Sequence, residues 1–265
     1  QVIDISNAAV PTRVGSRNAP NFYNGIVVSG AYAYLADSGT TALAVVGVSN
    51  PSIPSNAGLC NTLGTPSSLV VSGAYAYIAS TYGLEVQNIS DASTPSRRGS
   101  LSTYQGNDVV VSGAYAYLAD DAAGLRVINI SNPATPTLRG TFSIGANVAY
   151  GVAVSGSYAC LTTTYQSLYV INIANAALPT LMGTLDVGDN ANDIFVSGIF
   201  AYLTDNNAGL FIVSVYNPAS PVQTGGPAIT QISIPSGSSA VSLYYYDEAA
   251  GTYTLSAAKS GLTTG

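Results

Sequence analysis

One short motif returns at regular intervals and constrains the fold more than any other feature of the chain. The decapeptide of residues 28–37, Val-Ser-Gly-Ala-Tyr-Ala-Tyr-Leu-Ala-Asp, recurs nearly unchanged at 71–80 and 111–120, with looser copies at 154–161 and 196–205. Its glycine falls every 40 to 43 residues, at Gly30, Gly73, Gly113, Gly156 and Gly198. A fixed period of this length is typical of solenoids, propellers and arrays, whose units cannot bury their apolar faces alone.

Each unit reads as four short β-strands. In the third unit we expect strands at residues 108–111, 115–119, 125–130 and 137–142, separated by Gly, Asp, Asn and Pro turn residues. No segment shows helical periodicity. The first strand is apolar at consecutive positions, so it must be covered on both faces, as the sheets of a β-propeller are.

The fourth strand carries its own marker glycine, and this glycine counts the units. It occurs at Gly15, Gly58, Gly99, Gly140, Gly183 and Gly225. Residues 251–262 align without gaps on residues 73–84, which supplies a sixth unit, while residues 2–7 read as a third strand. We therefore predict a single all-β domain over residues 1–265. It is a six-bladed β-propeller of four-stranded antiparallel blades, closed by N- and C-terminal strands that share one blade.

These motifs resemble the LVIVP repeat family. Its units pair a Val-Ser-Gly-x-Tyr-Ala-Tyr segment with a Gly-Leu-x-Val-Ile-Asp-Ile-Ser-Asn-Pro segment, which appears here at residues 124–133 and 209–218. The resemblance implies a β-propeller of a bacterial or archaeal surface or secreted protein, without catalytic residues. The sixth unit departs from the pattern because it lacks Val-Ser-Gly, and the fourth has Cys160 in place of the second Tyr.

Composition excludes several function classes. The net charge of −6, without a basic stripe, argues against nucleic acid as a partner. No uninterrupted apolar run of about 18 residues occurs, so we expect no membrane insertion. A single Lys, no His and abundant Ser, Thr and Tyr favour an extracellular or cell-surface location. Cys60 and Cys160 fall in different units, and we expect them to stay unpaired.

One set of polar residues lies just before the first strands, where they should ring one mouth of a central channel. Such a mouth is where propellers commonly bind a small polar ligand, so these residues are candidate ligand-binding residues. Polar groups at the start of a strand, simply solvated, are the alternative. The candidates are Asn24, Ser67, Asn107, Asp108, Tyr150, Asn192 and Asp193.

Two further polar positions recur. Asp37, Asp120 and Asp205 close the second strand, where Asp is an ordinary turn residue, and a calcium loop is the alternative reading. Another slot, in the third strand, predicts a structural hydrogen bond between strands or blades. It holds Asp4, Asn88, Asn129 and Asn172.

The longest break in the period lies around residues 226–250. The interval between marker glycine and turn glycine is 14 to 16 residues in five units but 26 from Gly225 to Gly251. This insertion carries Tyr244, Tyr245, Tyr246 and Asp247. Tyr offers a large amphipathic contact area, so these residues form a candidate partner-binding surface. A degenerate blade that packs its own edge is the alternative.

The function that follows is non-enzymatic. We expect a structural or protein-interaction propeller of a surface assembly, filament or complex, which binds a protein partner or copies of itself and needs no cofactor or metal. Without His, no Ser-His-Asp arrangement is possible. One alternative is a ligand-binding module, either a carbohydrate-binding lectin with a glycan partner or a calcium-dependent adhesin. A remote one is a hydrolase that uses carboxylate pairs among Asp108, Asp193, Asp120 and Asp205.

Overall fold

A computed structural model describes residues 1–17, 21–164, 168–187, 191–205, 209–219 and 221–224. Within these ranges all regular secondary structure is β-strand, arranged as five four-stranded antiparallel sheets and one two-stranded sheet. Residues 1–226 make one compact unit, and the single domain over residues 1–265 stays a prediction. No described segment forms a helix long and apolar enough to cross a membrane.

We call the four-stranded sheets blades 1 to 5 and name their strands from the first to the fourth. Blade 1 comprises β3 (Tyr23–Ser29), β4 (Tyr32–Asp37), β5 (Ala42–Gly47) and β6 (Ser55–Asn61); blade 2 comprises β7 (Pro66–Ser72), β8 (Tyr75–Ser80), β9 (Gly83–Asn88) and β10 (Ser96–Ser102). Blade 3 comprises β11 (Asp108–Ser112), β12 (Tyr115–Ala119), β13 (Leu125–Asn129) and β14 (Thr137–Phe142); blade 4 comprises β15 (Ala149–Ser155), β16 (Tyr158–Thr163), β17 (Leu168–Asn172) and β18 (Thr180–Leu185). Blade 5 comprises β19 (Ala191–Ser197), β20 (Phe200–Asp205), β21 (Gly209–Ser214) and β22 (Val222–Thr224).

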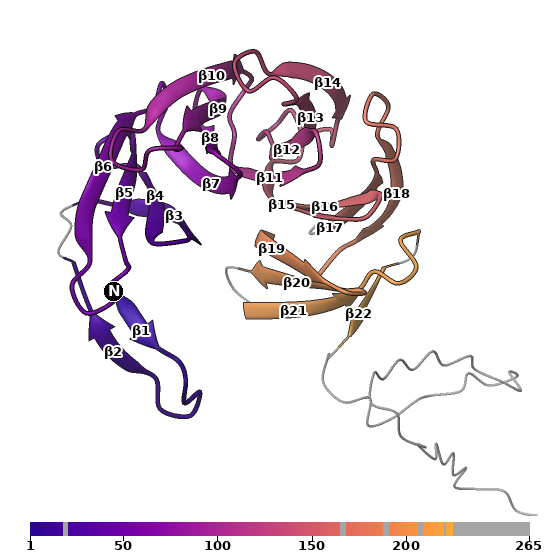
Figure 1. Cartoon of the computed structure of the whole chain (residues 1–265). Coiled ribbons are helices and arrows are strands. Elements are labelled where there is room, and N and C mark those ends of the chain that lie inside the picture. The colour runs from indigo at the N-terminus through magenta and orange to yellow at the C-terminus, as the bar shows by residue number, and fades with distance from the viewer. Residues whose placement is uncertain (18–20, 165–167, 188–190, 206–208, 220, 225–265) are drawn as a thin grey trace, which may run out of the picture. The chain divides into compact units, whose positions relative to one another are not determined.

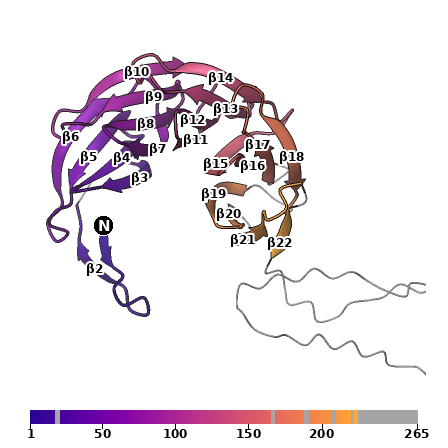
Figure 2. The same cartoon turned by 45° about the vertical axis from the view of Figure 1, so that its right-hand side comes forward.

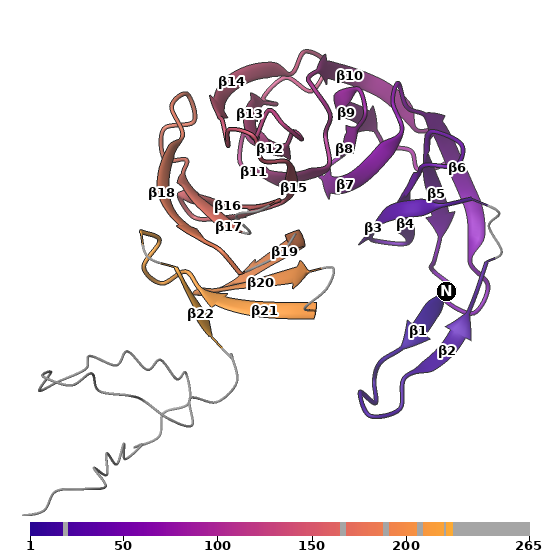
Figure 3. The same ribbon diagram turned by 180° about the vertical axis from the view of Figure 1, so that it is seen from behind.

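Successive blades touch through their first strands. β3 contacts β7, β7 contacts β11, β11 contacts β15, and β15 contacts β19. Figure 1 shows the blades following one another in chain order, with the first strands on the inside and β6, β10, β14 and β18 on the outside. The views in Figures 2 and 3 show the same order. The four-stranded blade and its predicted strands in the third unit are confirmed to within one residue at each end.

The apolar core lies between blades, with one buried cluster at each interface. Between blades 2 and 3, for example, Leu84 and Val86 of β9 pack with Leu118 of β12 and Ile128 of β13. Equivalent clusters join blades 1 and 2, 3 and 4, and 4 and 5. Each fully buried aliphatic side chain of this kind stabilises the fold by about 1.5–3 kcal/mol. A blade alone would leave both of its faces exposed, which explains why the unit repeats.

The five marker glycines in the described part of the chain lie where a fourth strand closely approaches the next blade. In blade 3, Gly140 pairs with Val127, and the register then shifts so that Ile128 pairs with Leu138. A Cβ on Gly140 would overlap the backbone carbonyl oxygen of Ala176 in blade 4. Glycine is required there by close approach of backbone, not by an unusual backbone angle.

The N-terminal residues form the two-stranded sheet of β1 (Val2–Asp4) and β2 (Thr12–Gly15). Val2 pairs with Gly15 and, after a register shift, Ile3 pairs with Arg13. The third and fourth strands of blade 1 pair in the same way, through Val45 with Gly58 and the shift that follows. The prediction that the N-terminus starts with a third strand is confirmed. Residues 251–262, assigned by sequence to the same blade, lie outside the described residues.

One prediction about the third strand is wrong. The side-chain oxygens of Asn88, Asn129 and Asn172 do not bridge strands or blades. Each accepts a hydrogen bond from the backbone N–H two residues later, at 2.9 to 3.0 Å, and Asp4 does the same with Ser6. The slot therefore ends the strand with a local side-chain turn, because Asn and Asp oxygens compete with the sheet for nearby backbone donors. Cys60 and Cys160 are unpaired, as predicted.

Replacing Gly140 with Ala should lower the free energy of unfolding by about 1–3 kcal/mol, since the methyl group forces blades 3 and 4 apart. Urea denaturation monitored by circular dichroism measures the loss. Thr141→Ala, at an exposed position of the same strand, is the matched control and should change stability by less than about 0.5 kcal/mol. Equal effects of both substitutions would contradict the close approach.

Candidate functional site

The starts of the five first strands surround one cavity of about 590 Å³, which we call the channel-mouth cavity. Every predicted ligand-binding residue lines it, so the structure brings together the side chains that the repeat placed at equivalent positions. That they bind a ligand stays a prediction. The lining residues are Tyr23, Asn24, Gly25, Ile26, Leu35, Ser67, Ser68, Leu69, Asn107, Asp108, Tyr150, Asn192 and Asp193.

Two asparagines of this cavity, Asn24 and Asn107, hold neighbouring blades together. The Asn24 side-chain amide donates a hydrogen bond to the carbonyl oxygen of Pro66, at 3.1 Å, in the first strand of blade 2. Asn107 makes the equivalent bond from blade 3 to the Ala149 carbonyl of blade 4, at 2.7 Å. These amides are part of the scaffold, and their donors are directed along the cavity wall to the next strand.

Asp108 joins three blades. One carboxylate oxygen accepts hydrogen bonds from the Ser68 hydroxyl of blade 2, at 2.6 Å, and from the Val109 backbone N–H. The other accepts from the Val152 backbone N–H of blade 4, at 2.9 Å. Both oxygens are therefore engaged by the protein itself.

The charge state of Asp108 reflects its surroundings. Burial raises its pKa above the usual range, and the nearby Asp193 carboxylate adds to the rise, although the three hydrogen bonds oppose it. Asp193 accepts a hydrogen bond from the backbone N–H of Ile194, at 2.8 Å. A hydrolase would need one of the two carboxylates to reach a substrate or water, and Asp108 is oriented toward its neighbouring strands instead.

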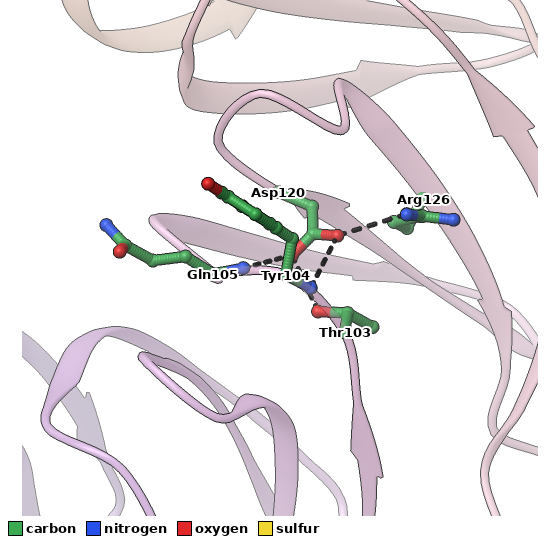
Figure 4. Close-up of polar contacts among 5 residues, drawn as sticks. All are labelled: Thr103, Tyr104, Gln105, Asp120 and Arg126. Atoms are coloured by element: carbon green, nitrogen blue, oxygen red, sulfur yellow. Dashed lines mark hydrogen bonds and ion pairs between the residues drawn. The ribbon is translucent and has the colours of Figure 1, made fainter.

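A second group of carboxylates anchors the connections that lead into the first strands. Asp120, directly after β12, is fully buried. It accepts hydrogen bonds from the Thr103 hydroxyl at 2.6 Å and from the backbone N–H groups of Tyr104 and Gln105. It also forms an ion pair with Arg126 of β13, at 3.0 Å (Figure 4). The interpretation of Asp120 as an ordinary turn residue therefore missed its role in holding the connection that leads into β11.

Asp37 has the equivalent role in blade 1. It accepts from Gly39 and Thr40 within its own turn and from the Asn21 side chain on the incoming connection, at 2.6 Å. Burial acts to raise its pKa, but the hydrogen bonds outweigh burial and the pKa lies below the usual value. The side chain of Asp205 lies outside the described part of the structure.

Blade 2 replaces this carboxylate with another that the sequence did not single out. Ser80 stands where blades 1 and 3 have Asp, and Glu85 of β9, also fully buried, supplies the carboxylate. Glu85 accepts from the backbone N–H groups of Leu63 and Gly64 on the incoming connection and from the Ser80 hydroxyl. Glu85 pairs with Ile78 just as Arg126 pairs with Leu118. The register of the repeat therefore places Glu85 and Arg126 at equivalent positions, and this signal could have identified both residues.

The described carboxylates do not form a cluster typical of a metal site. Within the described ranges no three His, Cys, Asp or Glu side chains gather in a way that could hold a metal ion. Donors from the protein already surround Asp37 and Asp120, so the calcium-loop reading finds no support in their geometry. The partner-binding candidates Tyr244, Tyr245, Tyr246 and Asp247 lie outside the described residues.

A family model described as the LVIVD repeat matches the chain six times, over residues 1–19, 24–62, 63–103, 105–143, 147–187 and 188–226. The chain belongs to the LVIVD repeat family. The resemblance drawn from the motifs is thus confirmed, and each complete LVIVD repeat coincides with one blade. The first match, residues 1–19, covers only β1 and β2. Among curated proteins, none matches the sequence.

Solved structures share the fold of these LVIVD repeats. A functionally unknown protein from Desulfotomaculum acetoxidans has a TM-score of 0.68 at 10% identity, with 80% of this chain and 73% of that chain covered. A protein from Lactobacillus plantarum has a TM-score of 0.67 at 16% identity, covering 76% of this chain and 69% of that one. At these identities the likeness extends to the fold alone.

Replacing Asp120 with Asn should lower the free energy of unfolding by about 3 kcal/mol. The amide offers one acceptor oxygen in place of two and turns an N–H group toward buried donors. Thermal and urea denaturation measure the loss. Asp121→Asn is the control, because Asn tolerates its φ of 48° and stability should change by less than about 0.5 kcal/mol. Equal stability of the two variants would refute the role of Asp120 as an anchor of the incoming connection.

Proposed function

We propose that this chain is a non-enzymatic interaction propeller, a closed six-bladed ring that packs against protein partners or copies of itself in an extracellular or cell-surface assembly. The use of polar side chains supports a role without catalysis. Asp108, Asp120 and Glu85 are all engaged in hydrogen bonds that tie blades or connections together. A group held in this way contributes to rigidity and has no free oxygen for substrate.

One observation carries the assembly proposal: apolar side chains are exposed at equivalent loop positions on both ends of the blades. On the connections between third and fourth strands, Val10, Ile53 and Leu178 each precede a proline and are 61 to 72% exposed. On the connections into the first strands, Leu63 and Tyr104 are exposed at equivalent places. Apolar groups repeated around a rim offer a contact surface, unlike single scattered ones.

The low charge of the chain fits dense packing. Only 8% of residues are charged, so two such surfaces repel one another weakly. The single Lys and the absence of His, together with many Ser, Thr and Tyr residues, support the extracytoplasmic setting.

Light scattering at rising protein concentration tests this proposal. The wild-type mass should grow beyond that of a monomer, and Ile53→Glu with Leu178→Glu should shift the association midpoint by at least about tenfold, because a charge replaces a buried aliphatic contact. Leu59→Glu with Leu181→Glu, two exposed leucines of the fourth strands, is the matched control. A wild-type protein that stays monomeric throughout would refute assembly through its own surface.

The channel-mouth cavity supports a second candidate function, binding of a small polar ligand such as a glycan. Tyr150 lines the cavity and would stack on a sugar, so Tyr150→Ala should abolish any binding found on a glycan array. Tyr104→Ala, exposed elsewhere, should leave binding intact. A glycan screen and a calcium titration that both leave the melting temperature unchanged would exclude this candidate.

A further inference from the structure

The interface between blades 4 and 5 lacks a tyrosine that each of the other three described interfaces contains at the same position. The second tyrosine of the repeated motif, present as Tyr34, Tyr77 and Tyr117, is only 4 to 5% exposed. These tyrosines belong to the apolar clusters that join blades 1 and 2, 2 and 3, and 3 and 4. Cys160 belongs to the cluster between blades 4 and 5, and it has the same place in the pairing of β16 with β17 as Tyr117 has in the pairing of β12 with β13. A thiol thus stands where the repeat has an aromatic ring.

A cavity of about 200 Å³, which we call the blade 4–5 cavity, lies at this position. Cys160 and Val170 line it from blade 4, and Val196 and Val215 line it from blade 5. A short side chain in place of a large one leaves a cavity where the surrounding structure does not collapse. An apolar cavity of roughly 150 Å³ is large enough to bind benzene. The blade 4–5 cavity therefore has room for one aromatic ring, and none of its lining residues belongs to the channel-mouth cavity.

Two side chains of blade 4 suit an aromatic ring in this cavity. In blade 2 the first tyrosine of the motif lies beside the second, with the ring centroids of Tyr75 and Tyr77 6.5 Å apart, and blade 1 has the same arrangement. Tyr158, the first tyrosine of blade 4, lines the cavity without a second tyrosine beside it in the motif. Cys160 supplies a sulfur atom, and sulfur makes favourable contacts with aromatic rings. Burial raises the pKa of the Cys160 thiol to about 12, so the thiol brings no charge into the cavity at neutral pH.

Blade 5 adds two large side chains to the same cavity. Ile199, in the turn between β19 and β20, replaces an alanine of blades 1 to 3, such as Ala114. Both carbonyl oxygens accept a hydrogen bond from the residue that follows the third strand, at 2.8 and 2.9 Å, so the two positions are equivalent. Tyr216 replaces a serine of blades 1 to 3, such as Ser131, at the second position after the third strand. Three departures from the repeat, at Cys160, Ile199 and Tyr216, thus meet at one cavity.

We propose that the blade 4–5 cavity binds a small free phenol, that is, one aromatic ring with a hydroxyl group. The ligand class follows from the residue that the other interfaces hold at this position, because the hydroxyphenyl group of tyrosine already fits between two blades of this repeat. The ring packs between aliphatic side chains of both blades. Ser155, which also lines the cavity, carries a hydroxyl that can pair with the hydroxyl of the phenol. The site is separate from the assembly surface and the channel-mouth ligand of the proposed function and depends on neither.

Isothermal titration calorimetry with para-cresol, which is the tyrosine side chain as a free molecule, tests the proposal. The wild-type chain should bind it with a dissociation constant of about 1 mM or lower. Cys160→Tyr restores the ring of the other interfaces and should weaken binding by at least about tenfold, because the new side chain occupies the cavity. Cys60→Ser, which removes the other thiol, is the control and should bind as the wild type does. No binding by the wild-type chain, or equal binding by a folded Cys160→Tyr variant, would overturn the proposal.

A second variant tests the site from blade 5, in case Cys160→Tyr does not fold. Ile199→Ala with Tyr216→Ser introduces the residues that blades 1 to 3 carry, so the turn keeps a sequence that the repeat accepts. The loss of apolar contact should weaken para-cresol binding by about three- to tenfold. Phe22→Ser is the matched control, because Phe22 is another exposed aromatic residue, 78% exposed, and does not line the cavity. An unchanged affinity of the double variant would place the ligand elsewhere and overturn the assignment.

Ligand size distinguishes a free phenol from a tyrosine side chain of a partner protein. N-acetyltyrosinamide carries the same ring together with two amide groups, for which a cavity of about 200 Å³ has no room. We therefore expect it to bind at least about tenfold more weakly than para-cresol in the same titration. Equal or tighter binding of N-acetyltyrosinamide would overturn the assignment to a free phenol. The outcome is independent of light scattering, so failure of this site and failure of the proposed assembly are measured separately.

Discussion

Burial of aliphatic and aromatic side chains between neighbouring blades is the interaction on which the rest of the structure depends. Each of the four interfaces between blades 1 to 5 holds one apolar cluster, built from the second and third strands of one blade and the first three strands of the next. A blade has no core of its own, so its stability comes from two neighbours. The close similarity of the repeated motif follows, because the same strand must fit two interfaces at once.

Such dependence explains where the three buried carboxylates Asp37, Glu85 and Asp120 lie. The chain between a fourth strand and the next first strand crosses from the outside of a blade to its inside, and its backbone N–H groups lose water on the way. Glu85 and Asp120 accept hydrogen bonds from those backbone groups, and Asp37 accepts one from the Asn21 side chain on its incoming connection. Several hydrogen-bond donors offset the desolvation cost of a buried carboxylate, whereas a buried carboxylate without donors would bear that cost in full.

Much of this could be predicted from the sequence, because periodicity determines both strands and register. The strands of blade 3 and the convergence of Asn24, Asn107 and Asp193 on one cavity follow from the repeat alone. Contacts between side chains do not. The Asn129 slot was misread because a local turn competes with a bond between strands. Glu85 was missed because its partners lie 21 and 22 residues earlier.

The anchors also distinguish a scaffold role from a chemical one. Blade 3 uses Asp120 to hold its incoming connection, and blade 2 uses Glu85 from a different strand. In blade 4, Tyr169 accepts from Asn147, and Thr164 accepts from the Val148 backbone N–H. A metal or catalytic site requires particular atoms, whereas holding a connection requires only an acceptor within reach. Carboxylates, a phenol and a hydroxyl all perform this task in different blades. The role of this position is therefore to hold the incoming connection, and any ligand chemistry must lie elsewhere on the molecule.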